Sequence, residues 1–522
     1  PCKNQFDPMP PKLFIFGIDG GTFDLVEPLI AENLLPNLAS LMSRGAWARM
    51  DCTWPPHTGP GWPSLVTGCR PGRHAAYQFF DTQEPDYQAR MVGSNDYGCP
   101  TVWEWLAGAG WTMGLINVPM SHPPRALPGY QITWPLSNTL RYSSPHGLLA
   151  ELANHGAHFQ SDLATMYRGD AGYIHEALGN VGARLRSLKY LLERHPTDAV
   201  MFVLTEADRV CHHYWHFSDP AHPQFAPDAD EAYRNAIRDI YRAVDDALGE
   251  ALRLIPEEAA VAVVSDHGFG PGGESFSVHR FLEDAGLLAT RAETESPAGE
   301  ENGQQVASWF REGGREVDWS RTKVYMPVPG AYGLNVNLKG RQRHGIVDEQ
   351  DRQRVLEETS ELLRAVRLPS TGEAAFERVL PREEAYPGPM CARAPDLLLI
   401  PRDESLMVVP TLTGAVWGLS QQTGLHRYEG MWIHASPRVR AGRLAHNVHI
   451  TDVAPTLLAD VGVDIPEFMQ GRVRREIFSD ASAGLGRYSS AFTPAPTDDE
   501  SKSPDAEEDE LTFRRLREMG YL

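Results

Sequence analysis

The sequence predicts an α/β protein whose central, mostly parallel sheet is enclosed by helices on both sides. Short runs that are almost wholly apolar recur at 13–18, 112–118, 199–204 and 259–264, with amphipathic stretches between them. Strands of this kind are typical of parallel sheets that are buried on both faces. Such sheets bind ligands at the carboxyl ends of their strands. The polar residues that follow each run are therefore the first candidates for chemistry.

The composition is that of a folded, acidic protein. The 522 residues include 48 basic and 69 acidic side chains, which give a net charge of −21, and 42% of the residues are hydrophobic. These values are close to globular averages, so the disordered, collagen-like and coiled-coil classes are excluded. A charge of −21 repels polyphosphate backbones, so we expect a small substrate and no stable nucleic acid complex.

Cysteine spacing and hydropathy predict a cytoplasmic protein. The six cysteines lie far apart without a CxxC pair, which fits neither a zinc ribbon nor a dense disulfide framework. No apolar run approaches the roughly 18 residues that a membrane span requires. Residues 1–11 show no charged and apolar regions of a signal peptide, although a chain that starts at Pro1 is compatible with a leader removed earlier.

Departures from the strand and helix pattern suggest the domain limits. Segments 136–180 and 290–325 are more polar, and we interpret them as insertions that cover the active site of one catalytic domain spanning 1–488. Residues 489–510 are acidic and rich in Pro and Ser, which predicts a disordered linker. Residues 511–522 regain helical spacing and form a predicted tail. The sequence leaves the oligomeric state open.

The first apolar run ends in Gly17-Ile18-Asp19-Gly20-Gly21-Thr22, for which three interpretations exist. Glycines after a buried strand often serve only the steric needs of a turn. The same pattern is similar to the phosphate loop of sugar kinases in the actin-like ATPase group. In the third interpretation the turn carries Asp19 as a metal ligand.

Thr58 stands before Gly59-Pro60 and an apolar stretch, which predicts a helix with Thr58 near its N-cap. A threonine at such a position is most often a cap. The functional alternative is a hydroxyl placed against a helix N-terminus, where free amides and the helix dipole favour an incoming phosphate.

Two further segments carry residue types that bind metals. Asp208 and His212 are four residues apart, so on a helix they share one face and can hold a divalent ion. Asp266 and His267 directly follow the most clearly buried run. The aromatic neighbours of the first pair are interpreted as core, with stacking on a nucleobase as the alternative: His213, Tyr214, Trp215 and Phe217.

The order of these candidates along the chain resembles the alkaline phosphatase superfamily, and within it the type I phosphodiesterase/nucleotide pyrophosphatase branch. The ordered positions are Asp19, Thr58, Asp208, His212, Asp266, His267 and a loop histidine, His426. Segments such as Ile116-Asn117-Val118-Pro119, Ala394-Pro395-Asp396 and Thr451-Asp452-Val453-Ala454-Pro455 extend the resemblance over most of the chain.

The resemblance implies an alkaline-phosphatase-like core with two divalent ions, zinc by preference and manganese as the alternative. One ion is expected on Asp208, His212 and His426, and the other on Asp19, Asp266 and His267. Thr58 is expected to bind the second ion and to act as the nucleophile, because a divalent ion lowers the pKa of a hydroxyl that is otherwise unreactive. The expected reaction passes through a phosphothreonine that water hydrolyses, on a phosphate ester or nucleotide-type substrate.

Several alternatives remain beside this hypothesis. Gly61, three residues after Thr58, has no side chain that could donate to a phosphoryl oxygen, so a phosphomonoesterase or phosphonate hydrolase stays open. Sulfatases require a C/S-x-P-x-R pattern, of which Thr58-Gly59-Pro60-Gly61-Trp62 keeps only the proline. Phosphoethanolamine transferases usually carry membrane helices, and cofactor-independent phosphoglycerate mutases use serine. A metal-binding scaffold without catalytic activity is the alternative from another class.

Overall fold

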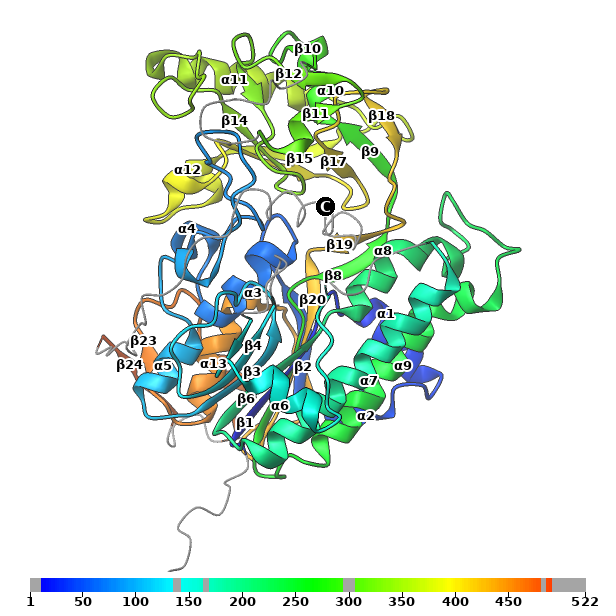
Figure 1. Cartoon of the computed structure of the whole chain (residues 1–522), viewed down its shortest axis with the longest axis vertical. Coiled ribbons are helices and arrows are strands. Elements are labelled where there is room, and N and C mark those ends of the chain that lie inside the picture. The colour runs from blue at the N-terminus through cyan, green and yellow to red at the C-terminus, as the bar shows by residue number, and fades with distance from the viewer. Residues whose placement is uncertain (1–10, 135–141, 163–168, 294–305, 480–484, 491–522) are drawn as a thin grey trace, which may run out of the picture.

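The computed structural model describes residues 11–134, 142–162, 169–293, 306–479 and 485–490. Its lower half is built on a sheet of ten strands in the order β21-β2-β20-β7-β1-β6-β3-β4-β5, with β22 paired to β2 (Figure 1). The strands are β1 (Leu13–Ile18), β2 (Ala46–Asp51), β3 (Met113–Val118), β4 (Gly129–Thr133), β5 (Ser143–Ser144), β6 (Ala199–Leu204), β7 (Ala260–Val264), β20 (Glu429–Ala435), β21 (Gly442–Arg443) and β22 (Val448–His449).

The middle of this sheet is parallel, as the sequence predicts. β1 lies between β6 and β7 and runs parallel to both, and β3 runs parallel to β6 and β4. The exceptions are β20, which is antiparallel to β2 and β7, and β5, which is antiparallel to β4. The carboxyl ends of β1, β6 and β7 therefore meet at one edge of the sheet.

Both faces of the sheet are covered, because side chains alternate between two cores. Phe14 and Phe16 of β1 belong to one core, and Leu13 and Ile15 belong to the other. The helices of the first face are α1 (Phe23–Ala31), α2 (Pro36–Arg44), α6 (Leu148–Asn154), α7 (Ala171–Arg194), α8 (Glu206–Ser218) and α9 (Glu231–Leu252). The second face carries α3 (Thr58–Thr67), α5 (Val102–Gly108) and α13 (Val453–Asp460). The predicted α/β sandwich is confirmed.

Between β7 and β20 the chain leaves the sheet and forms an upper unit (Figure 1). Its hydrophobic core also includes residues of the segment 76–92, Met120 and Trp134. The path out and back is a two-stranded ladder of β8 (Gly268–Pro271) and β19 (Gly424–Arg427). The sheet strands of the unit are β9 (Glu274–Ser277), β10 (Thr290–Ala292), β11 (Arg311–Glu312), β12 (Arg315–Val317), β13 (Val324–Tyr325), β14 (Gly333–Val336), β15 (Phe376–Pro381), β16 (Leu397–Pro401), β17 (Met407–Val409) and β18 (Trp417–Leu419). Its helices are α10 (Val278–Asp284), α11 (Arg352–Arg364) and α12 (Arg382–Ala385).

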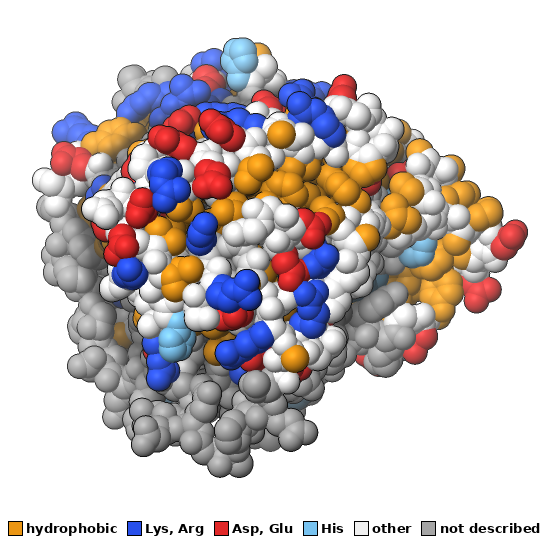
Figure 2. Space-filling view, turned by 90° about the horizontal axis from the view of Figure 1, so that it is seen from above, with side chains coloured by type: hydrophobic (Ala, Val, Ile, Leu, Met, Phe, Trp, Pro, Cys, Tyr) orange, Lys and Arg blue, Asp and Glu red, His pale blue; other side chains and the backbone are white. Residues whose placement is uncertain are grey.

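The predicted domain limits stay predictions. The proposed insertions 136–180 and 290–325 lie partly outside the described residues, and so does nearly all of the predicted linker and tail after Ser489. Within the described ranges, no helix combines the length and the apolar character needed to cross a bilayer. Seen from above, the described part of this face intersperses basic and acidic side chains around a band of hydrophobic ones (Figure 2).

Candidate active site

The seven predicted residues converge at the carboxyl edge of the central sheet. Asp19 directly follows β1, and Asp266 and His267 follow β7. Asp208 and His212 lie on α8, which follows β6, and β19 carries His426. All of these side chains are buried except that of His426, which is 9% exposed.

Thr58 is the first residue of α3, and His57 rather than Thr58 caps this helix. The Nδ1 atom of His57 accepts a hydrogen bond from the Gly59 N–H at 3.0 Å. The Thr58 hydroxyl lies 3.4 Å from Asp19 Oδ1 and 3.3 Å from the Nε2 atom of His267. The capping interpretation of Thr58 is therefore wrong, and its hydroxyl faces the cluster of carboxylates and histidines.

The three histidines present the same nitrogen to the site. His212 Nδ1 lies 2.9 Å from the Gly424 carbonyl oxygen, His426 Nδ1 lies 2.9 Å from that of Pro56, and His267 Nδ1 lies 3.0 Å from that of Gly268. A carbonyl oxygen only accepts, so each Nδ1 carries the proton and donates it. Each Nε2 is left with a lone pair. The hydrogen bond from Nδ1 to a carbonyl oxygen fixes the orientation and the tautomer of each ring, as metal-binding histidines require.

The Nε2 atoms of His212 and His426 lie 2.9 Å apart. With both protons on Nδ1, two lone pairs face each other at this distance, which is repulsive unless a cation lies between them. Asp208 Oδ1 is 3.1 Å from the His426 Nε2 and 3.5 Å from the His212 Nε2. These three side chains form one group whose donor atoms all lie within 4.8 Å, as the spacing predicts.

A second group of donor atoms within 4.8 Å consists of Asp19, Asp208 and His267. The predicted second set has Asp266 in place of Asp208. The Asp266 carboxylate accepts from the Gly20 N–H at 3.3 Å through Oδ1, and its Oδ2 lies 3.3 Å from the His267 Nε2. Asp208 lies between the two groups.

The electrostatics of these groups fit bound divalent cations. Burial raises the pKa of Asp19, and the charges of Asp266 and Asp208 raise it further. Burial and the Asp208 charge raise the pKa of Asp266 to about 8. Asp208 Oδ2 and Asp266 Oδ2 are buried without a hydrogen-bond partner among the described residues. Buried carboxylate oxygens with imidazole nitrogens beside them are a donor set that suits zinc.

Burial lowers the pKa of His267 to about 4, and burial with the neighbouring His267 lowers that of His426 to about 3. Both imidazoles are therefore neutral at pH 7, which is the form that binds metals.

Trp62 is a site residue that the sequence argument missed. Its indole Nε1 donates to Asp19 Oδ2 at 3.1 Å, and the ring is fully buried. The available signal was its spacing, because Trp62 follows Thr58 by one helical turn and shares its face.

Beneath α8 lies a buried ionic cluster. Arg184 Nη1 is 2.8 Å from Glu206 Oε1, and both Arg184 and Arg209 pair with Asp162. All four side chains are buried. Because Glu206 and Arg209 belong to the first turn of α8, the cluster anchors the helix that presents Asp208 and His212.

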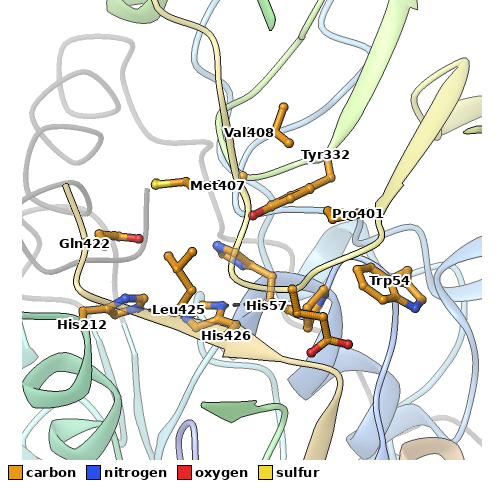
Figure 3. A pocket seen from close by; sticks show the side chains of 13 residues that line it. Trp54, His57, His212, Tyr332, Pro401, Met407, Val408, Gln422, Leu425 and His426 are labelled. Carbon is orange, nitrogen blue, oxygen red and sulfur yellow. Dashed lines mark hydrogen bonds between the residues drawn. The ribbon is translucent and has the colours of Figure 1, made fainter. Parts of the chain in front are cut away.

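A pocket opens beside His212 and His426 (Figure 3). These two histidines line its floor, Tyr332, Met407 and Val408 face them from the upper unit, and Trp54 stands at one side. The remaining lining residues are Pro56, His57, Gly330, Pro401, Glu404, Gln422 and Leu425.

The aromatic residues of the pocket differ from those that the sequence analysis named beside Asp208 and His212. Tyr214 and Trp215 of α8 are buried in the first core, which confirms their interpretation as core residues. The aromatic residues that line the pocket are Trp54 and Tyr332. The Trp54 ring also stacks on that of Tyr428, with 5.5 Å between the ring centroids. Neither Trp54 nor Tyr332 carries a local sequence signal, because only the folded chain brings them together.

Comparison with known proteins places this chain in a class of metal-dependent phosphoryl hydrolases. A model of the family "type I phosphodiesterase / nucleotide pyrophosphatase" matches residues 13–429. The chain belongs to this family, which is divalent-metal dependent. The predicted family and the predicted enzyme class are confirmed.

Solved structures share the fold at low sequence identity. Human ectonucleotide pyrophosphatase/phosphodiesterase 5 has a TM-score of 0.52 and 13% identity, covering 90% of this chain and 100% of its own. Phosphonoacetate hydrolase from Sinorhizobium meliloti 1021, solved with phosphonoformate, has a TM-score of 0.52 and 18% identity over 85% of this chain and 94% of its own. At these identities the likeness shows the fold alone. No curated protein matches the chain.

Proposed function

We propose that the protein hydrolyses phosphoric diesters with two divalent ions and a phosphothreonine intermediate on Thr58. The observation that supports this most strongly is the meeting of three inward-facing Nε2 atoms, three buried carboxylates and one hydroxyl. Within the site, Thr58 carries the hydroxyl that lies against this cluster, 3.3 Å from the His267 Nε2.

Asp208, His212 and His426 would hold one ion, and Asp19, Asp266 and His267 would hold the other. Mixed imidazole and carboxylate ligands favour zinc, and manganese is the alternative. When bound, such ions lower the pKa of a hydroxyl and stabilise charge on the oxygens around phosphorus.

The residues of the chain then act as follows. The Thr58 hydroxyl, which lies beside Asp19 and His267, loses its proton to solvent as its oxygen attacks phosphorus. The bond from Thr58 Oγ1 to phosphorus forms as the ester bond breaks, and the leaving alkoxide takes up a proton. Water afterwards cleaves the bond between Thr58 and phosphorus, which releases the phosphate product and restores the hydroxyl.

The pocket favours a neutral or cationic leaving group. Its walls are apolar and aromatic at Trp54, Tyr332 and Leu425, with the carboxylate of Glu404 among them and no Lys or Arg among its described lining residues. A diester places an organic group there. The competing phosphonate reading is less favoured, because a carboxylated phosphonate would set its own negative charge near Glu404.

Replacement of the nucleophile tests this function. Thr58→Ala should keep the fold and its zinc and lower kcat on bis-p-nitrophenyl phosphate by at least about 10³-fold, whereas Thr58→Ser should retain part of the activity. Thr67→Ala is the matched control, because Thr67 lies on the same helix and its hydroxyl donates to the Pro63 carbonyl.

Acid quenching during turnover should yield a phosphorylated peptide that contains Thr58 in the parent protein and none in Thr58→Ala. A fully active Thr58→Ala protein would refute the covalent mechanism. Zinc-loaded parent protein that releases no p-nitrophenol from mono- or diesters would instead favour the metal-binding scaffold.

A further inference from the structure

The turn after Thr58 cannot supply a side-chain donor for a phosphoryl oxygen. A Cβ atom at Gly61 would lie 2.9 Å from the Asp266 Cβ and 3.0 Å from its carbonyl oxygen, so the position tolerates only glycine. The same holds for Gly59, whose Cβ would lie 2.8 Å from the carbonyl carbon of Gln78. A side-chain donor must come from a residue outside the turn.

The backbone that packs against Gly59 belongs to Gln78, and this residue has an unused donor. Gln78 is fully buried, and its Oε1 accepts the Phe79 N–H at 2.8 Å. Because a backbone N–H requires an acceptor, this bond fixes the orientation of the amide. Nε2 is buried and makes no hydrogen bond to the described residues. Buried donors without partners are rare and call for an explanation.

The unused donor lies behind the pocket wall at a place where the wall has no side chain. A Cβ atom at Gly330 would lie 2.8 Å from Gln78 Nε2 and 3.5 Å from His57 Nε2. Gly330 and His57 both line the pocket, together with the metal-site residues His212 and His426. Gln78 Nε2 therefore lies beside Gly330 and His57 of the pocket wall, and His57 directly precedes Thr58 in the chain.

We propose that Gln78 Nε2 donates a hydrogen bond to a non-reacting oxygen of the phosphoryl group held at Thr58. The proposal rests on the proposed function and names a substrate-binding residue for it. It explains how a turn with glycine at positions 59 and 61 could bind an anionic phosphoryl group, and why a buried amide has no hydrogen-bond partner among the described residues.

The test is phosphate binding by the zinc-loaded protein. Gln78→Met preserves the shape of the side chain and removes the donor, and it should weaken inorganic phosphate binding in isothermal titration calorimetry by about 10- to 100-fold. The kcat/KM on a diester should fall by a similar factor. Gln78→Asn, which withdraws the amide by one methylene, should weaken binding in the same direction and serves if the methionine variant does not fold.

Gln342→Met is the matched control. Gln342 is also buried, its Oε1 also accepts a backbone N–H, and its Nε2 also makes no hydrogen bond to the described residues. The difference is that Gln78 Nε2, and not Gln342, is among the atoms nearest to a Cβ built at Gly330 of the pocket wall. This variant should bind phosphate like the parent. If both Gln78 variants bind phosphate as tightly as Gln342→Met does, Gln78 has only a structural role and the proposal is wrong.

Failure of this inference and failure of the proposed function give different results. A parent protein that binds phosphate through Gln78 but hydrolyses no ester would refute the function and keep the binding residue. A parent protein that hydrolyses diesters while the Gln78 variants match its phosphate affinity and kcat/KM would refute only the inference. A parent protein that binds no phosphate at all would also refute the inference about Gln78.

Discussion

Asp266→Asn should stabilise the metal-free protein against unfolding and reduce the stability that the protein gains from bound zinc. In the metal-free state, burial and the neighbouring Asp208 charge raise the pKa of Asp266 from 3.8 to about 8. Below pH 4 the carboxyl group is protonated in both the folded and the unfolded protein, so it has no effect on stability there. As the pH rises, only the unfolded state loses the proton, and the folded state becomes less stable until the pH reaches about 8.

The size of the effect follows from the distance between these pKa values. About three pH units separate the unperturbed value from pH 7, and each unit corresponds to about 1.4 kcal/mol, so the carboxyl group costs about 4 kcal/mol at neutral pH. The asparagine keeps an oxygen for the Gly20 N–H and carries no ionisable group. It should therefore add about 4 kcal/mol to the free energy of unfolding at pH 7 and almost nothing at pH 4.

Chemical unfolding in the presence of a chelator, between pH 4 and pH 8, measures this difference. Asp396→Asn is the matched control of opposite sign: burial raises the pKa of Asp396, but Arg341 and Arg352 outweigh it and lower the pKa. That variant should lose about 3 to 5 kcal/mol at pH 7. In saturating zinc, Asp266→Asn should gain less stability from the metal than the parent does. A metal-free Asp266→Asn protein that is less stable than the parent at pH 7 would refute the electrostatic argument.

The remaining predictions concern the metal groups and their support. Zinc-reconstituted protein should contain two equivalents of metal, and Asp208→Ala or His426→Ala should remove one of them and lower kcat by several orders of magnitude. His216→Ala, on the same helix as Asp208, should change the metal content and kcat little. Equal losses for all three variants in metal analysis and kinetics would contradict the assignment of Asp208 and His426 as metal ligands. Trp62→Phe removes the hydrogen bond to Asp19 and should lower kcat/KM about 10-fold with little change in Tm, and an unchanged rate would show that this bond is dispensable.

The sequence predicted the site residues whose positions depend on a single strand end or a single helix. Asp19, Asp266 and His267 were found because they lie within three residues of the end of a buried strand of one parallel sheet, and the ends of these strands coincide. Asp208 and His212 were found from their helical spacing. His57 was missed as the cap of α3, because a histidine ring is an uncommon acceptor at this position, and Thr58 was the residue type expected there.

The pocket could not be predicted in the same way. Trp54 precedes α3, whereas Tyr332 and Glu404 belong to the upper unit, and no spacing in the sequence relates these positions. Their approach depends on how the upper unit packs over the edge of the sheet. The aromatic residues of α8, which did have a sequence signal, face the core because that helix buries one side against the sheet.

The ladder of β8 and β19 explains how one chain can keep a precise metal site beneath a large inserted unit. His426 lies opposite Phe269, only two residues after His267, so backbone pairing fixes the third histidine relative to the end of β7. The upper unit begins and ends beyond this ladder, and Tyr332, Met407 and Glu404 of the pocket come from it. The side chains that would meet the leaving group can therefore change without displacing the side chains that would hold the ions. In this fold the residues at the edge of the sheet would determine where the reaction occurs, and residues of the upper unit would determine which substrate binds.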